Sequence, residues 1–307
     1  MDYQFTFTVF IPTYNRSHLL PRAIQSVQQQ SFKDFELLIV DDGSTDDTKQ
    51  VAEEWQKNSD FPIHYWYQEN QGKHAAHNAA LKLARGFFTV ILDSDDRLAP
   101  DALERLLFHW ENIPKDTRDR FAGIEGLCAY ENGKIAGTRF PGKVLDSNYI
   151  ETRRKLGVGG DKKNAIRTDV LCEFPFPVFD GEKFIRESIV WDKMAKKYSF
   201  RYINEVIQII EYQADGLSSN PFRLRVNNPQ GFRRCFQDEV NFLDDEQNIV
   251  ELLNNYAKYV RYSLHCGIGY HQQYQDIKSS ILWLLSIPGG TIDWLRDKVK
   301  IKRLRHI

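Results

Sequence analysis

The 307-residue sequence predicts an α/β fold with a mostly parallel central sheet that is flanked by helices on both faces. Two features of the first hundred residues support this prediction. Short apolar runs alternate with amphipathic helical segments, which is the pattern of consecutive β-α units. Three of the apolar runs end in polar, mainly acidic residues, and the parallel strands of such a sheet bring their carboxyl ends together where ligands bind.

The four strand–helix pairs can be assigned in order along the chain. Apolar, β-rich runs predict strands at residues 7–11, 35–40, 63–68 and 87–92. Ser17 and Thr45 are candidate N-caps for the first two helices, because their hydroxyl groups can accept from backbone N–H groups. Gly86 is a candidate end for the Ala-rich third helix, and Pro100 suits the first turn of the fourth.

The pattern becomes less regular after about residue 120. Amphipathic spacing predicts a helix over residues 182–198, and a strand follows over residues 200–212. From about Pro221 the pattern is helical to the end. The predicted domains are therefore a main domain at residues 1–220, with halves at about 1–115 and 116–220, and a helical extension at residues 221–307.

The composition excludes several classes of protein. The net charge is −1 and charged residues make up 27% of the chain, so no overall electrostatic field indicates a nucleic-acid partner. Four widely spaced cysteines without a C-x-x-C pair argue against a zinc site and against a disulfide framework. Because neither a basic leader nor a run of about 18 apolar residues occurs, we expect a cytoplasmic protein without a membrane span.

The stretch FFTVILDSDDRL, residues 87–98, ends a buried strand in three carboxylates, Asp93, Asp95 and Asp96. Like charges that are close together and partly buried raise the free energy of their ionised forms. A divalent cation offsets that cost, and carboxylate oxygens are ligands that Mg²⁺ and Mn²⁺ prefer. Such a cation keeps positions open for the phosphate oxygens of a nucleotide diphosphate. The alternative interpretation is an exposed acidic turn before the next helix.

Two stretches of the chain together resemble the N-terminal half of the family 2 glycosyltransferases, which are nucleotide-sugar enzymes with the Rossmann-like GT-A fold. The stretches are VFIPTYNRSHLLPRAIQSVQQQSFKDFELLIVDDGSTDDT and NQGKHAAHNAALKLARGFFTVILDSDD. The resemblance covers about residues 5–110 closely and continues more loosely through IRTDVL, GEKFIRESIVWDKMAKKY and EYQADGLSSN. A dinucleotide oxidoreductase is excluded, because no G-x-G-x-x-G follows the first strand.

The resemblance implies a binding site for a UDP-sugar at the three polar strand ends. The turn after the first strand would border the nucleobase, and Asp42, beside Asp41, would accept from the uracil N–H group. The residues expected to bind the nucleotide sugar are Pro12, Thr13, Tyr14, Asn15, Asp41, Asp42, Gly72, Lys73, His77, Asp93, Ser94 and Asp95. The expected ligands of a divalent cofactor, Mn²⁺ or Mg²⁺, are Asp95 and Asp96.

One position departs from the family pattern. Many members have Ala-Arg-Asn where this chain has Ala76-His77-Asn78, so a permanent cation is replaced by a side chain that is only partly protonated near neutral pH. Lys73 and His74 could supply diphosphate contacts instead. Alternatively, His77 is a polar position on a packed helix.

The resemblance also implies a catalytic base near the start of the helix predicted over residues 182–198. An inverting transfer needs a carboxylate that takes the proton of the acceptor hydroxyl group. A gapless register puts Glu187 at the position of the family's catalytic aspartate, with Asp192 as the rival and Glu182 as a weaker choice. Each of these acids could instead be a solvated side chain of the helix.

The end of the chain mixes aromatic, apolar and basic residues. Residues Arg296–Arg305 contain six Lys or Arg and one acid, Asp297. A basic amphipathic helix of this kind can lie on a membrane that carries anionic lipids. We expect surface binding for Arg296–Arg305. For Ser280–Trp294 we expect a helix that packs on the catalytic domain or forms an oligomer contact.

Together these features predict a metal-assisted, inverting hexosyl- or N-acetylhexosaminyltransferase in surface polysaccharide synthesis. Its donor would be a UDP-sugar, and its acceptor a glycan or lipid-linked saccharide at the inner face of the cell membrane. The alternative is a nucleotide-sugar-binding subunit of a polysaccharide assembly that has lost catalysis. A nucleic-acid-binding role explains none of the acids and has no supporting motif.

Overall fold

The computed structural model describes residues 2–213 and 220–304. The chain divides into two compact units. We call Met1–Phe176 with Val190–Ala214 the sheet unit, and Pro177–Ile189 with Asp215–Ile307 the helical unit. The second crossing between the units lies close to the domain boundary expected at residue 220. The segment Pro177–Ile189, however, groups with the C-terminal helices rather than with the sheet.

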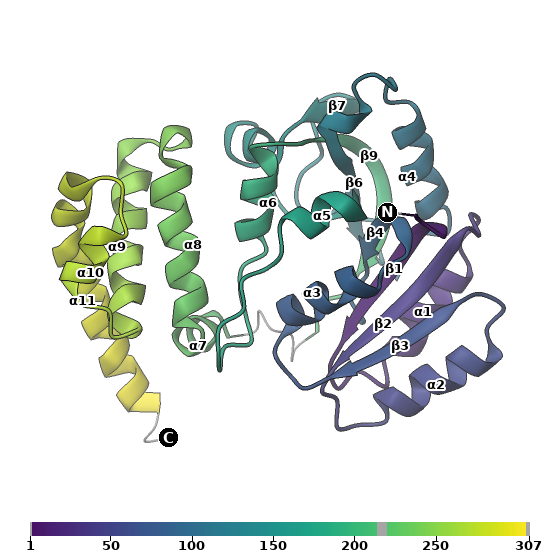
Figure 1. Ribbon diagram of the computed structural model, residues 1–307, viewed down its shortest axis with the longest axis horizontal. Helices are drawn as coiled ribbons and strands as arrows, with labels where there is room; N and C mark the ends of the chain where they lie inside the picture. Colours follow the sequence, from purple (N-terminus) through teal and green to yellow (C-terminus); the bar gives the residue numbers. More distant parts are fainter. Residues whose placement is uncertain (1, 214–219, 305–307) are drawn as a thin grey trace. The chain divides into compact units, whose positions relative to one another are not determined.

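Within the described residues, the sheet unit contains a nine-stranded sheet whose first four strands are parallel (Figure 1). The strand order is β3-β2-β1-β4-β8-β6-β9-β5, and β7 pairs with β9. The four predicted strand–helix pairs are confirmed, and antiparallel pairing of β8 with β4 and β6 makes the sheet mixed. The strands are β1 (Phe5–Thr13), β2 (Phe35–Asp42), β3 (Ile63–Gln68), β4 (Gly86–Ile91), β5 (Arg97–Leu98), β6 (Phe121–Tyr130), β7 (Val144–Ser147), β8 (Lys162–Arg167) and β9 (Ser199–Ile210).

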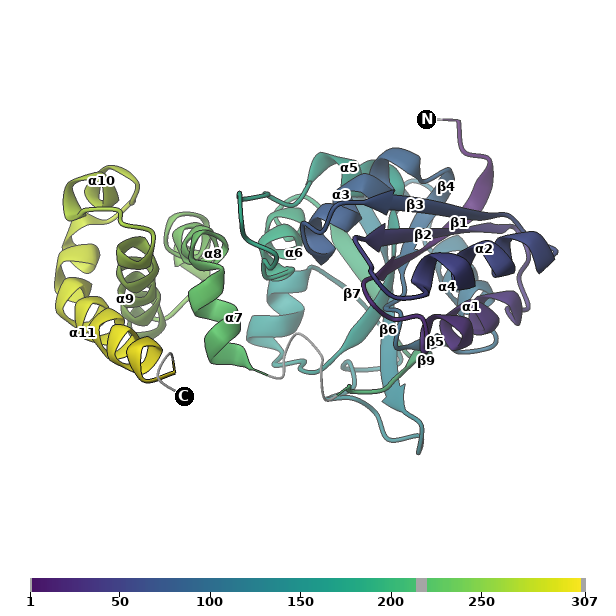
Figure 2. The ribbon, with the colours of Figure 1, turned by 90° about the horizontal axis from the view of Figure 1, so that it is seen from below.

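Helices cover both faces of the sheet, as predicted (Figure 2). Side chains alternate between the faces along each strand, so Val9, Leu37 and Val90 point to one face and join its core. The helices on that face are α1 (Leu20–Gln28), α2 (Thr48–Asn58) and α4 (Ala102–Glu111), and those on the opposite face are α3 (Lys73–Leu83) and α5 (Thr168–Glu173).

The first two helices have no side-chain N-caps, so the predictions for Ser17 and Thr45 were wrong. α1 begins at Leu20 and α2 begins at Thr48. The carboxylate of Asp46 instead accepts from the backbone N–H group of Ser17 at 3.0 Å and from the hydroxyl group of Thr48 at 2.5 Å. Asp46 therefore joins the segments that precede both helices.

Gly86 begins β4 rather than ending α3, whose last residue is Leu83. β4 approaches β1 so closely here that a side chain at position 86 would collide with the backbone of Phe7 and Thr8. The glycine is thus required by close strand packing and not by a helix end.

The helix predicted over residues 182–198 is shorter, because α6 spans only Ser188–Ala195. The side-chain oxygen of Asn228 accepts from the backbone N–H groups of Lys183 and Phe184, at 2.8 and 3.0 Å. These contacts hold the preceding segment in a non-helical conformation against the helical unit. The predicted start was therefore wrong.

The helical unit packs its longer helices around an aromatic core, with α9 between α8 and α11 (Figures 1 and 2). Its helices are α7 (Pro221–Asn227), α8 (Pro229–Phe242), α9 (Ile249–His265), α10 (Tyr270–Gln275) and α11 (Ser280–Leu304). The core includes Phe232, Phe236, Tyr256, Tyr259, Tyr262 and Trp283. In the described part of the chain, no helix combines the length and the apolar character that a membrane crossing requires.

Candidate active site

The polar residues that follow β1 and β2 form one connected structure at the carboxyl edge of the sheet. Thr13 pairs with Asp41 in the register of the two strands. Beyond them, the N–H group of Asn15 donates to Oγ of Ser44, and the N–H group of Thr45 donates to Oδ1 of Asn15, both at 2.8 Å. Asn15 has a φ of 51°, a left-handed conformation that is uncommon for residues other than glycine. The first two predicted site segments therefore meet.

The turn after β1 exposes an aromatic ring and buries an unsatisfied hydroxyl group. Tyr14 is 47% exposed, although it lies between largely buried segments. Oγ1 of Thr13 is buried and has no hydrogen-bond partner among the described residues. Because buried polar atoms are usually paired, this turn has the features of a surface that a ligand completes.

The carboxylate of Asp42 holds the loop between β3 and α3. It accepts from Nε2 of Gln68 and from the backbone N–H groups of Gln71 and Gly72, at distances of 2.7–2.9 Å. An ionised carboxylate offers about four acceptor positions. The chain itself occupies three of them, so one remains for a ligand.

Asp41 is also used within the protein. Its Oδ1 accepts from the N–H group of Ser44 at 2.8 Å, and its Oδ2 accepts from the hydroxyl group of Tyr65 at 2.7 Å. Burial, and then this hydrogen bond, raise the pKa of Tyr65, which therefore stays a donor. Asp41 thus fixes the shape of the turn that carries Asp42.

The acidic cluster after β4 begins with a paired carboxylate. Oδ1 of Asp93 lies 2.7 Å from Nζ of Lys73, the first residue of α3. Lys163 on β8 is buried, and its ammonium group donates to the carbonyl oxygen of Ile91. Burial opposes ionisation, but the charges of Lys73 and Lys163 prevail and lower the pKa of Asp93. Asp93 is therefore an anion at neutral pH.

The pKa values of Asp95 and Asp96 are shifted in the opposite direction from that of Asp93. Burial, and then the charge of Asp93, raises the pKa of both carboxyl groups, that of Asp96 to about 7. Asp96 is 8% exposed and accepts from Nε2 of Gln208 at 2.5 Å and from the N–H group of Glu211 at 3.1 Å. The end of β9 therefore fixes Asp96 in a buried position, where the charge of Lys163 lowers its pKa but does not outweigh burial and the charge of Asp93.

Arg22 on α1 connects the acidic cluster to the end of β9. Its guanidinium group donates to the backbone carbonyl oxygen of Asp95 and lies 2.5 Å from the carboxylate of Glu211. Arg22 therefore links the backbone of Asp95 to the side chain of Glu211, whose own N–H group donates to Asp96.

A divalent cation fits the charge of this cluster. Asp93 is paired with Lys73, and the nearby cations do not prevent burial and the charge of Asp93 from raising the pKa values of Asp95 and Asp96. Among residues 2–213 and 220–304, no group of three or more His, Cys, Asp or Glu side chains is arranged to hold a metal ion. Asp95 and Asp96 are the residues that could hold a cation here, and Mg²⁺ is commonly held by one or two carboxylates together with phosphate oxygens of a ligand.

Both candidate histidines of α3 are buried. His77 is 4% exposed, and its ring lies edge-on to Phe10 and Phe176, with ring centroids 5.9 and 4.9 Å apart. These contacts favour the interpretation of His77 as a packed position on the helix. Burial lowers the pKa of His74, so it brings little charge at neutral pH. Lys73 therefore supplies positive charge at the start of α3.

Glu182, the weakest of the three candidate bases, caps a helix of the helical unit. Its two carboxylate oxygens accept from the backbone N–H groups of Gln230 and Gly231, at 2.6 and 2.7 Å. These groups belong to the first turn of α8, where a negative charge is stabilised by the helix dipole. Glu182 thus has a structural use.

Glu187 and Asp192 differ in exposure. Asp192 on α6 is 8% exposed, and its Oδ2 lies 3.7 Å from Nη2 of Arg154. Glu187 is exposed and directly precedes α6, in the last part of the segment that belongs to the helical unit. A carboxylate at that position is accessible to an acceptor.

Sequence reasoning missed Arg22, Lys163 and Gln208, which support the acidic cluster. Each lies more than 70 residues from the group that it contacts, so no local motif contains them. The one available signal was Lys163, a charged residue within the strand KKNAIR. Lysine is rarely buried without a partner, so a lysine on a core strand indicates a nearby acid or carbonyl group.

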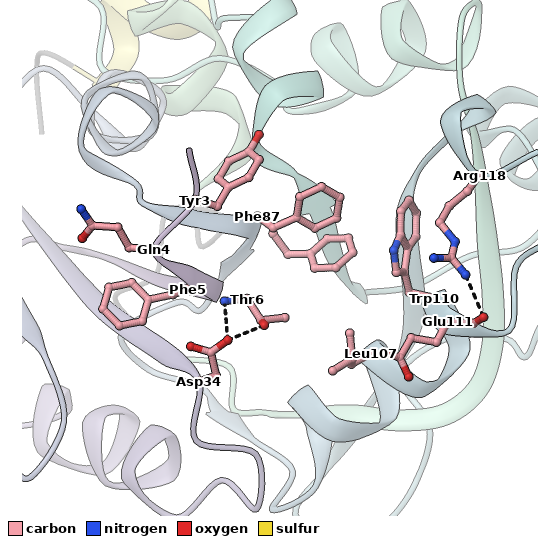
Figure 3. Close-up of a pocket in the computed structure, with 11 residues that line it drawn as sticks. Tyr3, Gln4, Phe5, Thr6, Asp34, Phe87, Leu107, Trp110, Glu111 and Arg118 are labelled. Carbon is pink, nitrogen blue, oxygen red and sulfur yellow. Dashed lines mark hydrogen bonds between the residues drawn. The ribbon is translucent and has the colours of Figure 1, made fainter. Parts of the chain in front are cut away.

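A pocket of about 360 Å³ lies at the opposite edge of the sheet, beside the amino ends of β1 and β4 (Figure 3). The rings of Tyr3 and Phe87 pack on each other, with centroids 5.3 Å apart. Asp34 accepts from the N–H and hydroxyl groups of Thr6, at 3.0 and 2.6 Å. None of the predicted site residues lines this pocket, so we do not assign it to the active site.

Comparisons with known proteins identify the sequence pattern. Residues 8–121 match the family described as glycosyl transferase family 2. The chain is 27% identical over 291 residues to GalNAc(5)-diNAcBac-PP-undecaprenol beta-1,3-glucosyltransferase of Campylobacter jejuni, covering 92% of this chain and 90% of that protein. It is 42% identical over 152 residues to chondroitin synthase of Escherichia coli, covering 48% of this chain but 20% of that protein.

Solved structures share the fold. TarS of S. aureus in complex with UDP-GlcNAc has a TM-score of 0.59 and 18% identity, covering 91% of this chain and 79% of that chain. The mannosyltransferase PcManGT of Pyrobaculum calidifontis, in complex with GDP-Man and Mn²⁺, has a TM-score of 0.54 and 18% identity, covering 94% of this chain and 81% of that chain. At these identities the likeness concerns the fold alone.

Proposed function

We propose that the chain is a family 2 glycosyltransferase with the GT-A fold that transfers a hexose or N-acetylhexosamine from a UDP-sugar to a lipid-linked glycan, with inversion. The observation that carries this proposal is the acidic cluster. Asp95 and Asp96 have raised pKa values at the sheet edge where the ends of β1 and β2 also meet. A cation with a diphosphate would offset their charge.

The donor would bind across the three connected strand ends. The remaining acceptor position of Asp42 suits the N–H group of a uracil ring. Tyr14 and Thr13 would border the base, since one is exposed and the other carries an unsatisfied hydroxyl group. We leave His77 out of the proposed contacts because its buried ring packs edge-on against two phenylalanines.

The proposed base is Glu187. Its carboxylate takes the proton of the acceptor hydroxyl group while the acceptor oxygen bonds to the anomeric carbon and the bond to the UDP oxygen breaks. Asp192 remains the rival. Its low exposure and its proximity to Arg154 make it less accessible to an acceptor. A bound cation would supply positive charge for the departing diphosphate.

The relatives support the choice of donor and acceptor. The name of the Campylobacter jejuni relative describes glucose transfer to an undecaprenol-linked saccharide, and the match extends over most of both chains. One TarS structure contains UDP-GlcNAc. We therefore propose UDP-glucose and UDP-GlcNAc as the first donors to test, with a polyprenyl-diphosphate-linked saccharide as the acceptor, in surface polysaccharide synthesis.

The test of the donor site is a thermal-shift comparison of UDP and GDP, each with and without Mn²⁺. A ligand that binds the folded state raises the melting temperature by mass action, so we expect the largest shift for UDP with Mn²⁺. Asp95→Ala with Asp96→Ala should abolish that shift. Asp116→Ala with Asp119→Ala, a pair of exposed acids on the same unit, is the matched control. A larger shift with GDP would contradict the proposal.

The test of catalysis is the transfer of labelled sugar from UDP-sugars to the lipid-linked acceptor. Transfer by the wild type supports an active enzyme. Binding of UDP and Mn²⁺ without transfer to any acceptor would favour the alternative, a nucleotide-sugar-binding subunit.

A further inference from the structure

The long C-terminal helix α11 is held firmly against the helical unit by one face. Trp283, Ser286 and Gly290 are buried on the side of α9. Val260 lies so close to Gly290 that a side chain at position 290 would overlap it. Asp297 accepts from the guanidinium group of Arg261 at 2.6 and 2.7 Å. The first part of the tail is therefore a helix that packs on α9 of the helical unit, whereas the sequence predicted packing on the catalytic domain or an oligomer contact.

The opposite face of α11 is apolar and exposed. Its large apolar side chains form two groups, at residues 281–285 and 292–299, and the helical period places both groups on the same side of the helix. They are Ile281, Leu284, Leu285, Ile292, Leu295 and Val299, each between 49% and 73% exposed. We call these six residues the α11 strip. Exposed apolar side chains are ordinary when scattered, but six of them gathered on one face of a helix mark an interaction surface.

Basic residues accompany the strip along the last two turns of α11. They are Arg296, Lys298, Lys300, Lys302 and Arg303. The helix contains two acids. Asp297 is engaged by Arg261 and His265, and Asp293 lies 3.3 Å from Arg296. Arg305, part of the predicted basic tail, lies outside the described residues.

The helical period places these basic residues at the borders of the strip. Arg296 and Arg303 fall on one side of it, and Lys302 falls on the other. Lysine and arginine at such borders can reach lipid phosphates while the apolar side chains enter the acyl region. This is the pattern of a helix that lies in a membrane interface.

We propose that the α11 strip and its flanking basic residues form a binding surface for a membrane that carries anionic lipids. A second copy of the chain is the competing occupant. The strip contains no acid that could complement the flanking Lys and Arg of another copy, whereas anionic headgroups supply that complement. The inference goes beyond the proposed transfer reaction, because it uses only the helical unit.

The experiment is co-sedimentation of the full-length protein with vesicles. One set contains phosphatidylcholine alone, and the other contains phosphatidylcholine with phosphatidylglycerol. We expect binding to the second set that weakens as salt is added, because salt screens the attraction between Lys or Arg and headgroups. Leu284→Gln with Leu295→Gln and Val299→Gln should reduce the partition coefficient by about tenfold or more.

The matched control is Phe242→Gln with Ile249→Gln and Val250→Gln. These three side chains are 56–63% exposed in the same unit but lie outside α11. The control should leave vesicle binding unchanged, and thermal melting should show that both triple variants are folded.

Two results would overturn the proposal. One is vesicle binding that the strip variant and the control variant reduce equally. The other is a wild type that ignores vesicles and forms a dimer by light scattering, which the strip variant converts to a monomer. That second result would assign the strip to a second copy of the chain.

Discussion

Asp96 in the sheet unit is 8% exposed although it is an acid, whereas Leu285 in the helical unit is 66% exposed although it is apolar. Burial is unfavourable for an ionised carboxylate, and exposure to water is unfavourable for an apolar side chain. Each of the two residues also has a neighbour in the same situation. Asp95 shares the raised pKa of Asp96, and Leu284 shares the exposure of Leu285. Because such arrangements cost free energy, their recurrence in one place indicates a ligand that offsets the cost.

The comparison also separates the two kinds of ligand. In the sheet unit, the carboxylates of Asp95 and Asp96 lack sufficient positive charge around them, and the ligand proposed there is a cation with a phosphate-bearing donor. In the helical unit, apolar side chains of α11 are exposed beside Lys and Arg residues, and the ligand proposed there is a lipid surface. The two proposals together describe transfer from a water-soluble donor to a lipid-linked acceptor at a membrane surface.

The largest expected effect tests whether Glu187, the exposed carboxylate that precedes α6, is the catalytic base. Glu187→Gln should lower kcat by about 10²–10⁴-fold, because the amide cannot take the acceptor proton. The thermal shift with UDP and Mn²⁺ should stay unchanged. Asp192→Asn is the comparison variant. If it shows the larger loss of kcat with intact UDP binding, Asp192 is the base and the assignment is reversed.

The next prediction concerns the pH dependence of Mn²⁺ binding at the acidic cluster of the sheet unit. Burial raises the folded-state pKa of Asp96 from its ordinary value of 3.8 to about 7, so protons compete with a cation below that pH. The apparent affinity for Mn²⁺ should therefore fall from about pH 8 to about pH 6, approaching tenfold per pH unit below the pKa.

The same shift has a consequence for stability without a cation. Because the folded state holds a proton that the unfolded state releases, the contribution of Asp96 to stability falls as pH rises from about 4 through about 7. Titrations of Mn²⁺ and melting curves over this range measure both effects. In Asp96→Asn, Mn²⁺ binding should be weak and lack this pH dependence. A wild type with pH-independent Mn²⁺ binding would contradict the prediction.

A smaller effect tests the buried cation beside the acids. Lys163→Met removes a charge that lowers the pKa of Asp93 and Asp96, and it leaves the carbonyl oxygen of Ile91 without its donor. We expect a loss of about 1–3 kcal/mol in unfolding free energy. The pH midpoint of Mn²⁺ binding should also move upward. Lys57→Met, at an exposed position of the same unit, should change neither quantity.

The smallest effects compare the two faces of α11. Gly290→Ala should lower the unfolding free energy by about 1–3 kcal/mol, because the new methyl group would overlap the carbonyl oxygen of Ala257 and the side chain of Val260. Leu285→Gln on the exposed face should change it by no more than about 0.5 kcal/mol. Denaturant unfolding of both variants measures the difference. Equal losses would mean that the α11 strip is packed against protein, and the helical unit would then have no exposed apolar surface on α11 to compare with the buried acids of the sheet unit.

The sequence predicted the parallel half of the sheet because its strands are local apolar runs. β9 was predicted as a strand, but β8 escaped prediction, since it pairs with β4 across some eighty residues and no motif records that pairing. The acidic cluster and Lys73 were found for the same local reason. Arg22 and Gln208 were not, because their roles depend on contacts between distant segments.

His77 shows a second limit of prediction from sequence. A histidine on an Ala-rich helix is compatible with a phosphate contact and with a packed ring, and sequence spacing alone does not separate the two. The structure favours packing, because the rings of Phe10 and Phe176, which are far apart along the chain, both contact the ring of His77 edge-on.

The helical unit is assembled from two stretches of chain, Pro177–Ile189 and Asp215–Ile307. Glu182 caps α8, and Asn228 holds the backbone of Lys183 and Phe184. The C-terminal helices are therefore not a detachable module. A protein cut at residue 220 would lose the scaffold of the loop that presents Glu187, and a chimera that exchanges the helices must exchange that loop with them.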